Sequence, residues 1–129
     1  VYGPRQISKG SMATVVGIFQ DCFLNNKTLP VVKPGTQSRR FTHVQDTVNT
    51  CYEAWKLKKN EHYSISSKKS YTIIQLARMF KSKLKFYPPR EGERYASALN
   101  KMSLNNKINQ RFGKIDLKDY IDQFINAKN

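Results

Sequence analysis

The chain has 129 residues, with 23 Lys and Arg against 9 Asp and Glu, and carries a formal net charge of +14 at pH 7. Hydrophobic residues make up 39% and aromatic residues 12%, which is enough for a folded core and excludes a disordered chain. No apolar run approaches the about 20 residues of a membrane-spanning helix, and the first residues do not resemble a signal peptide. We therefore expect one folded unit over residues 1–129, without a membrane segment and in the cytoplasm.

Two cysteines and two histidines are too few for a disulfide framework or a zinc site. Cys22 and Cys51 each lie in an apolar helical pattern, where a free cysteine is usually a small buried hydrophobic residue, although one pair remains open. His43 and His62 are isolated, and a metal site needs three or four ligands. We predict a reducing compartment and no metal site.

The charge of +14 favours an anionic partner, which could be nucleic acid, an anionic membrane or a phosphorylated small molecule. Lysines are spread over many segments beside abundant Asn, as on solvated surfaces, with only short clusters such as 56–59. The charge by itself does not choose among these partners.

The first third of the chain predicts a helix followed by a β-hairpin. Apolar residues recur at helical spacing over 12–24. A strand at 29–32, a turn at 34–35 and a second strand at 38–41 would together form the hairpin. Pro30 places the first strand at a sheet edge or at its own start.

The middle of the chain predicts a helix and a short strand. Thr42 and Gln45 have the spacing of a capping box, so we expect Thr42 to be the N-cap of a helix over 44–56. A strand follows at 63–66. The apolar stripe of the helix is expected to face the core, and its members are Val44, Val48, Cys51, Tyr52 and Trp55.

Helices and short strands continue to alternate in the last part of the chain. The expected elements are a helix over 73–80 behind the capping box of Thr72 and Gln75, a strand at 84–87, a helix over 101–110 ended by Gly113, and a helix over 117–125 capped by Asp116. Repeats and long linkers are absent from the sequence. We therefore expect an α+β fold in which helices surround a small mixed sheet.

Most catalytic motifs are missing from the sequence. The six glycines are scattered, and neither a glycine-rich nucleotide loop nor a Gly-x-Ser-x-Gly elbow is present. Tyr52 and Lys56 match the Tyr-x-x-x-Lys spacing of short-chain dehydrogenases, but no nucleotide-binding turn precedes them. We interpret this match as chance and assign no catalytic residue.

Two basic segments carry the chemistry that is present. Arg39 and Arg40 follow the predicted hairpin turn, and Arg90 follows a proline pair, with Glu93 close behind. A guanidinium group offers a planar fork of donors that matches phosphate oxygens. Arg39 and Arg90 could clamp a diphosphate while Glu93 accepts hydrogen bonds from ribose hydroxyls. The alternative is that both arginines make surface ion pairs, which contribute little.

Four stretches resemble, in order and spacing, extended short-chain dehydrogenases that act on nucleotide sugars. They are 1–6, 14–19, 35–44 and 88–93, of which 35–44 is the most specific. The resemblance covers nearly the whole chain and is greatest to UDP-glucose and UDP-N-acetylglucosamine 4-epimerases, which are NAD-dependent isomerases. It departs from the family at Arg40, where an Asp is usual, and it fades after Arg94.

The resemblance implies that these residues form the C-terminal, nucleotide-sugar-binding portion of an epimerase or dehydratase. The Rossmann half that binds NAD and carries the catalytic Tyr-x-x-x-Lys pair would be missing, so the chain is not expected to be active alone. Residues 44–56 and 63–66 would complete the edge of that half. Without it, they would expose apolar surface that favours self-association.

The resemblance also assigns roles to single residues. Arg39 and Arg90 match the phosphate ligands, and Glu93 matches the acidic residue that holds the ribose.

The base and the sugar are assigned in the same way. Pro30 and Val31 fall where backbone groups meet the uracil, Thr14 and Val15 fall where a helix start approaches the nucleotide, and Tyr2 would border the sugar pocket.

A second hypothesis is a stand-alone basic module that binds nucleic acid or another anionic partner. Scattered Tyr and Phe residues could stack on bases beside a basic groove. The aromatic residues lie mostly on stripes that are expected to be buried, and no nucleic-acid recognition motif is present. We therefore regard the nucleotide-sugar hypothesis as the stronger one.

Overall fold

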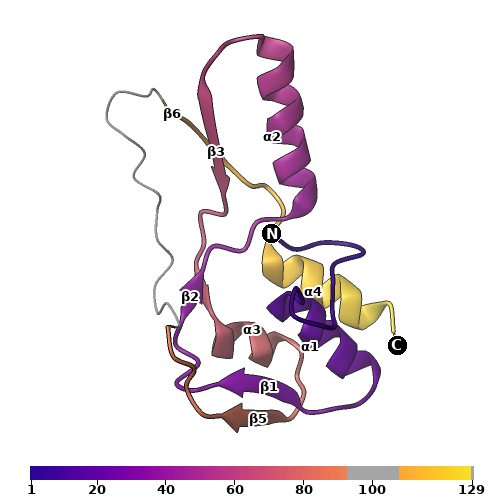
Figure 1. Ribbon diagram of the computed structural model, residues 1–129. Helices are drawn as coiled ribbons and strands as arrows, with labels where there is room; N and C mark the ends of the chain where they lie inside the picture. Colours follow the sequence, from indigo (N-terminus) through magenta and orange to yellow (C-terminus); the bar gives the residue numbers. More distant parts are fainter. Residues whose placement is uncertain (93–107, 129) are drawn as a thin grey trace.

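The computed structural model describes residues 1–92 and 108–128, which form an elongated molecule with two lobes (Figure 1). Three helices and a parallel strand pair make up the lower lobe, and one long helix packs against another parallel pair in the upper lobe. Within the described ranges, no helix is both long and apolar enough to cross a bilayer.

The lower lobe contains the hydrophobic core. Its helices are α1 (Val15–Leu24), α3 (Ile73–Met79) and α4 (Leu117–Asn126), and its parallel strands are β1 (Leu29–Val32) and β5 (Leu84–Tyr87). Phe80 is fully buried, and its ring contacts those of Phe19, Phe23 and Phe124. Side chains from all three helices and from β1 therefore share one core, whose fully buried members are Phe19, Leu29, Val31, Leu76, Ala77, Phe80 and Ile121.

The predicted β-hairpin is wrong. β1 pairs in parallel with β5, while β2 (Ser38–Arg39) pairs antiparallel with β4 (Tyr71–Thr72). The turn between β1 and β2 does not fold back on β1, because it is docked on the start of α3. The backbone N–H of Ile74 donates to the Gly35 carbonyl over 3.0 Å, and that of Ile73 donates to the Gln37 carbonyl over 3.1 Å.

Gly35 allows this turn to lie close to α3. Its φ of +75° is in the left-handed region, and a Cβ there would lie 2.5 Å from Cγ1 of Ile74. A side chain at this position would both strain the backbone and push the turn away from α3. Glycine therefore helps to set the position of the residues that follow, up to β2.

The upper lobe consists of α2 (Val44–Leu57) packed on the parallel strands β3 (His62–Ser66) and β6 (Ile108–Phe112). The helix predicted over 101–110 is wrong at 108–110, and the rest of that range lies outside the described residues. Pairing with β3 along all five positions outweighs the local preference of this polar segment, as tertiary context often does.

The N-cap of α2 is His43 rather than Thr42. The Nδ1 atom of His43 accepts a hydrogen bond from the Gln45 backbone over 3.1 Å. The backbone of Thr42 is instead held by the first residues of the chain, because the Tyr2 N–H donates to its carbonyl over 2.9 Å.

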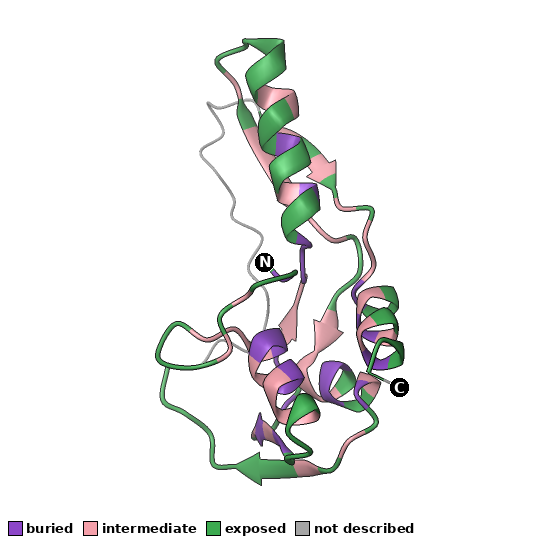
Figure 2. Ribbon diagram, turned by 90° about the vertical axis from the view of Figure 1, so that its right-hand side faces the viewer, coloured by how far each residue is buried: buried purple, intermediate pink, exposed green. Residues whose placement is uncertain are grey.

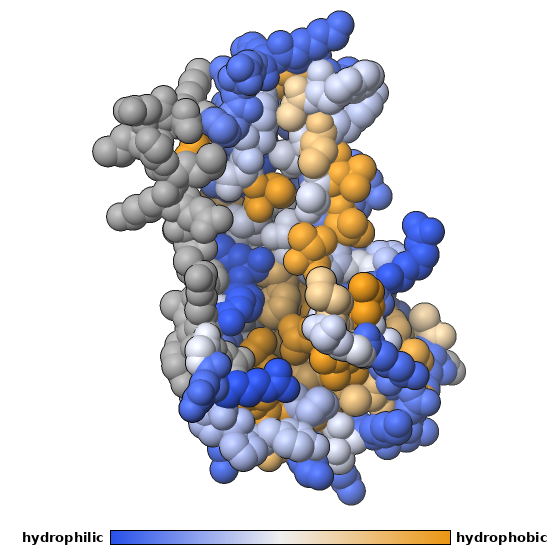
Figure 3. Space-filling model, viewed as in Figure 1, coloured by the Kyte–Doolittle hydropathy of each residue, from blue (hydrophilic) through white to orange (hydrophobic). Residues whose placement is uncertain are grey.

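The two faces of α2 are the reverse of those expected from its apolar stripe. Val48, Tyr52 and Trp55 are 53%, 57% and 69% exposed, and Val44 and Cys51 are exposed as well. Figure 2 shows most of the helix as exposed, and Figure 3 shows apolar side chains along its outer side. The exposed surface formed by these five residues is called the α2 apolar face below.

Polar groups fasten the inner face of α2. Asp46 and Thr50 are buried, and an Asp46 carboxylate oxygen accepts a hydrogen bond from the Ile115 backbone over 3.0 Å. One turn further, Glu53 accepts from Nε and Nη2 of Arg111 on β6, the shorter of these bonds being 2.7 Å. The helix is thus attached by its polar side, which leaves the apolar face uncovered by the described residues.

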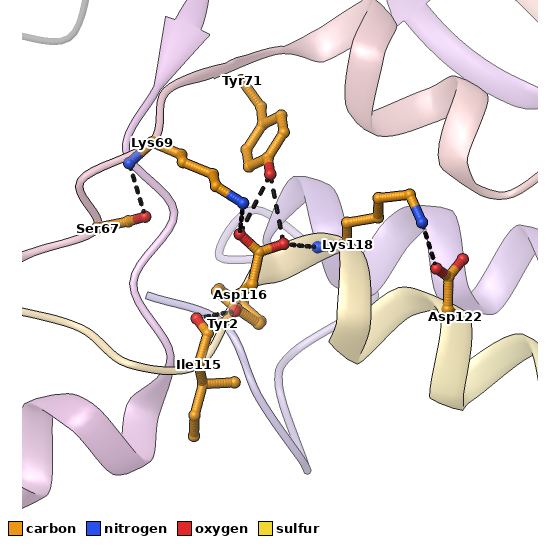
Figure 4. Close-up of polar contacts among 8 residues, drawn as sticks. All are labelled: Tyr2, Ser67, Lys69, Tyr71, Ile115, Asp116, Lys118 and Asp122. Atoms are coloured by element: carbon orange, nitrogen blue, oxygen red, sulfur yellow. Dashed lines mark hydrogen bonds and ion pairs between the residues drawn. The ribbon is translucent and has the colours of Figure 1, made fainter.

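Asp116 joins α4 to the loop before β4 (Figure 4). Its carboxylate caps α4 by accepting from the Lys118 backbone over 2.9 Å, and it also accepts from Lys69 Nζ over 2.8 Å and from the Tyr71 hydroxyl over 3.3 Å. The predicted caps at Asp116 and at Thr72 with Gln75 are confirmed.

Candidate functional site

A cavity of about 360 Å³ opens in the lower lobe between α1, β1 and the segments that carry β2 and the end of β5. Four residues singled out from the sequence line it, namely Val15, Pro30, Arg39 and Arg90. The fold therefore brings together side chains from four separate stretches of the chain.

The walls of the cavity are mostly apolar. Ile18 and Phe19 of α1 face it from one side, and Pro30 and Val32 of β1 line it from another. Ala13, Val15, Ile73 and Tyr87 complete the apolar lining. Such walls can bury the face of a flat ring, while polar groups at the rim fix its orientation.

Two of the described lining residues, Arg39 and Arg90, are charged, and both carry guanidinium groups. Arg39 lies on β2, where its Nη1 donates to the Ser38 carbonyl over 2.8 Å, and Arg90 lies in the segment after β5. None of the described residues that line the cavity is acidic. Two positive charges beside apolar walls suit a multiply charged anion such as a diphosphate, because each fork can bond two oxygens.

Strand direction determines which backbone groups of β1 face the cavity side. The N–H groups of Leu29 and Lys33 donate to the carbonyls of Lys83 and Tyr87, so the odd-numbered residues of β1 turn their backbone groups toward β5. Pro30 and Val32 turn theirs toward the opposite edge. The backbone groups of Val31 therefore face β5, and those of Pro30 and Val32 lie at the other edge of β1.

Gln37 is a cavity residue that sequence reasoning missed. It is 1% exposed and lines the cavity, with its Nε2 directed to the Val32 carbonyl at 3.5 Å. Its position two residues before Arg39 was the available signal, since alternate residues of an extended segment share a face.

The remaining predicted residues do not line this cavity. Thr14 is the N-cap of α1, with its hydroxyl accepting from the Gly17 backbone over 3.0 Å, and the Val31 side chain is fully buried in the core. Arg40 points elsewhere, because its Nη1 donates to the Ser67 carbonyl over 3.1 Å. Glu93 lies outside the described residues.

Tyr2 is a core residue in this structure. It is 1% exposed, its ring packs edge-on against His43 and Tyr120, and its hydroxyl donates to the Ile115 carbonyl over 3.1 Å. Burial, followed by the negative charges of Asp116 and Asp46, raises the pKa of this hydroxyl far above its usual range. Tyr2 therefore stays protonated and fastens the start of the chain to the segment before α4.

The sequence of this chain lacks the glycine-rich turn of a dinucleotide site. Such a site needs closely spaced glycines at a strand-to-helix turn, whereas the six glycines here are far apart. The space beside Gly17, in the first turn of α1, is occupied by the chain itself, since a Cβ there would lie 2.5 Å from the Ile7 carbonyl oxygen. That NAD is held by residues outside this chain stays a prediction.

Comparison with known proteins relates the chain to nucleotide-sugar enzymes. The model of the NAD dependent epimerase/dehydratase family matches residues 1–66. A Methanocaldococcus jannaschii protein provisionally named UDP-glucose 4-epimerase is 33% identical over 137 aligned positions, which cover 98% of this chain and 42% of that protein. This chain thus spans less than half the length of that relative.

Solved structures share the fold. The Thermotoga maritima UDP-glucose 4-epimerase, crystallised with UDP-glucose, is 26% identical with a TM-score of 0.77, over 98% of this chain and 42% of that one. A Bacillus cereus UDP-glucuronic acid 4-epimerase is similar in fold, with 21% identity and a TM-score of 0.74, over 99% of this chain and 43% of that one. By the family match over residues 1–66, this chain belongs to the NAD-dependent epimerase/dehydratase family.

Proposed function

We propose that this chain is the nucleotide-sugar-binding portion of an NAD-dependent sugar 4-epimerase or dehydratase, and that its ligand is a UDP-sugar. The observation that carries the proposal is the cavity that Arg39 and Arg90 both line, beside apolar walls. Relatives named for UDP-sugar epimerisation support it.

In this proposal, the two arginines bind the diphosphate and the apolar walls bury the nucleoside. Pro30 and Val32 present the edge of β1 to the base, and Glu93 accepts hydrogen bonds from the ribose. Binding energy from the nucleotide would position a sugar whose reacting carbon lies outside this chain's own residues. The chain is therefore not expected to turn over substrate alone.

The proposed partner is the nucleotide-binding half of such an enzyme, which would hold NAD and the catalytic residues. The matched relatives extend well beyond the region that this chain covers. The α2 apolar face supports this partner, because a parallel two-stranded sheet with one helix is rarely stable without further cover.

In isolation, the α2 apolar face should cause self-association. We expect sedimentation velocity to show a concentration-dependent oligomer that the double variant Val48→Gln/Trp55→Gln reduces to monomer, because both side chains are more than half exposed. Met12→Gln, which changes a residue 75% exposed outside α2, should leave the oligomer unchanged. A monomer at every concentration would contradict this expectation.

Calorimetric titration tests the proposed function directly. Saturable binding of UDP-glucose, with weak and strongly salt-dependent binding of a random oligonucleotide, is the expected result. Tight binding of the oligonucleotide without any binding of UDP-glucose would favour the stand-alone nucleic-acid module instead. Epimerisation by the chain alone would contradict the assignment of catalysis to another portion.

A further inference from the structure

We propose that Gln37 is a specificity-determining residue of the cavity, and that its side-chain carbonyl oxygen accepts a hydrogen bond from the nucleoside of the ligand. The inference rests on the proposed function and deepens it. The donor would be the imide N–H of a uracil-type base or a ribose hydroxyl, and the experiment below separates the two.

The first observation is an unpartnered polar atom. Gln37 is 1% exposed, and its Oε1 has no hydrogen-bond partner among the described residues. Buried polar groups nearly always have a partner, because one left without it costs on the order of 1–3 kcal/mol. Gln37 lines the cavity, so a bound ligand could supply the missing donor.

The second observation is the direction of the amide. The Nε2 atom lies 3.5 Å from the Val32 carbonyl oxygen, which accepts and cannot donate. Rotating the amide by half a turn would place two oxygens against each other there. The end without a partner is therefore an acceptor, and it selects a ligand group that donates.

The third observation is that the residue is held in place. The backbone carbonyl of Gln37 accepts a hydrogen bond from the Ile73 N–H at the start of α3, and the backbone carbonyl of Gly35, in the same turn, accepts one from the Ile74 N–H. A residue fixed at two points loses little further freedom when it binds, which favours selective recognition.

Position relative to Arg39 favours the nucleoside as the source of the donor. Two residues of extended chain span about 6–7 Å, so Gln37 and Arg39 lie on one face at about that distance along the backbone. With the diphosphate at Arg39, Gln37 reaches the group attached to it. The amide of Gln37 lies against Val32 on the apolar β1 wall, which suits the nucleoside, whereas the reacting sugar has to reach groups outside this chain.

The test measures UDP binding to this chain and to its Gln37→Leu variant by calorimetry, together with thermal unfolding. Leucine removes the orphan acceptor, so we expect UDP affinity to fall about 10-fold while the unfolding midpoint stays constant or rises. A purely structural glutamine would show the opposite pattern, with a lower midpoint and unchanged affinity, and this result would overturn the inference.

A matched control is Gln20→Leu. Gln20 is also a buried amide, but it has partners, since its Oε1 accepts from Gln6 over 2.6 Å and its Nε2 donates to the Tyr120 hydroxyl over 3.4 Å. This variant should lower the unfolding midpoint and leave UDP affinity within about 2-fold of the unmodified chain, because only satisfied bonds are lost.

Two analogues separate the possible donors. N3-methyl-UDP lacks the imide N–H, and 2′,3′-dideoxy-UDP lacks the ribose hydroxyls. For the analogue that lacks the donor to Gln37, the loss of affinity relative to UDP should be about 10-fold smaller in Gln37→Leu than in the unmodified chain. The loss that the dideoxy analogue suffers at Glu93 should be the same in both proteins. A loss of affinity for both analogues that is unchanged in Gln37→Leu would overturn the inference.

The outcomes also distinguish this inference from the proposed function. UDP binding that depends on Arg39 and Arg90 but is unchanged in Gln37→Leu would overturn the role of Gln37 alone. The absence of any saturable UDP binding by the unmodified chain would overturn both.

Discussion

The double variant Arg39→Ala/Arg90→Ala is expected to bind UDP at least about 100-fold less tightly than the unmodified chain. A hydrogen bond between charged groups is worth roughly 1.5–3 kcal/mol, and a single guanidinium fork can make two of them to a phosphate. Each single variant should lose about 10-fold, because the other arginine still holds the diphosphate. Calorimetric titration with UDP measures all three.

Arg78→Ala is the matched control for this experiment. Arg78 is exposed on α3 and lies outside the cavity, so its removal changes the net charge by the same amount as each single variant without touching the proposed site. Its affinity for UDP should stay within about 2-fold of the unmodified chain, since a distant exposed charge is screened by salt. An equal loss in Arg78→Ala would show that general charge, rather than the two forks, binds the nucleotide.

Asp116→Ala is expected to lower the free energy of unfolding by about 2 kcal/mol, from the lost N-cap and the lost partner of the Tyr71 hydroxyl. The carboxylate holds α4 and the loop before β4 together, so its removal also frees Lys69. Urea unfolding of both proteins measures the difference. Asp116→Asn should recover about half of it, because Asn is a good N-cap without the charge.

Acid should act on the same carboxylate. Burial pushes the pKa of Asp116 up, but hydrogen bonds from Lys69, the Lys118 backbone and Tyr71 outweigh burial, and the pKa lies below its usual value. The stabilisation is therefore complete above about pH 5 and is lost as the pH falls through about 3.9 toward the lower folded value. Asp116→Asn should show a flatter loss of stability over this range. Identical pH profiles for the two proteins would contradict this account.

Local signals in the sequence predicted most elements. The structure confirms the helix starts predicted at Thr72, with Gln75, and at Asp116. These could be predicted because a cap depends only on residues within one turn. Arg39 and Arg90 could be singled out because few residue types suit a diphosphate, and the fold places both at one cavity. Their role in binding stays a prediction.

The pairing of the strands and the choice of the buried side of α2 depend on contacts between residues far apart in the sequence, which no local pattern contains. The hairpin failed because the Gly35 turn is held by α3, and residues 108–110 became a strand because β3 lies beside them. Periodicity identified the two sides of α2 but not which one the chain buries, since the buried side is attached through Asp46 and Glu53. The spacing of Gln37 from Arg39 indicates only a shared face, and it took the structure to show that the side-chain oxygen of Gln37 has no partner among the described residues.

The order in which the chain visits the two lobes has a mechanical consequence. It runs through the lower lobe with α1 and β1, the upper with α2 and β3, the lower again with α3 and β5, the upper with β6, and ends below in α4. Any single break between α1 and α4 would therefore leave two fragments that share the lower lobe. Such halves should stay together as a nicked molecule, and a ligand in the cavity should slow their separation where the break falls between two segments that line it.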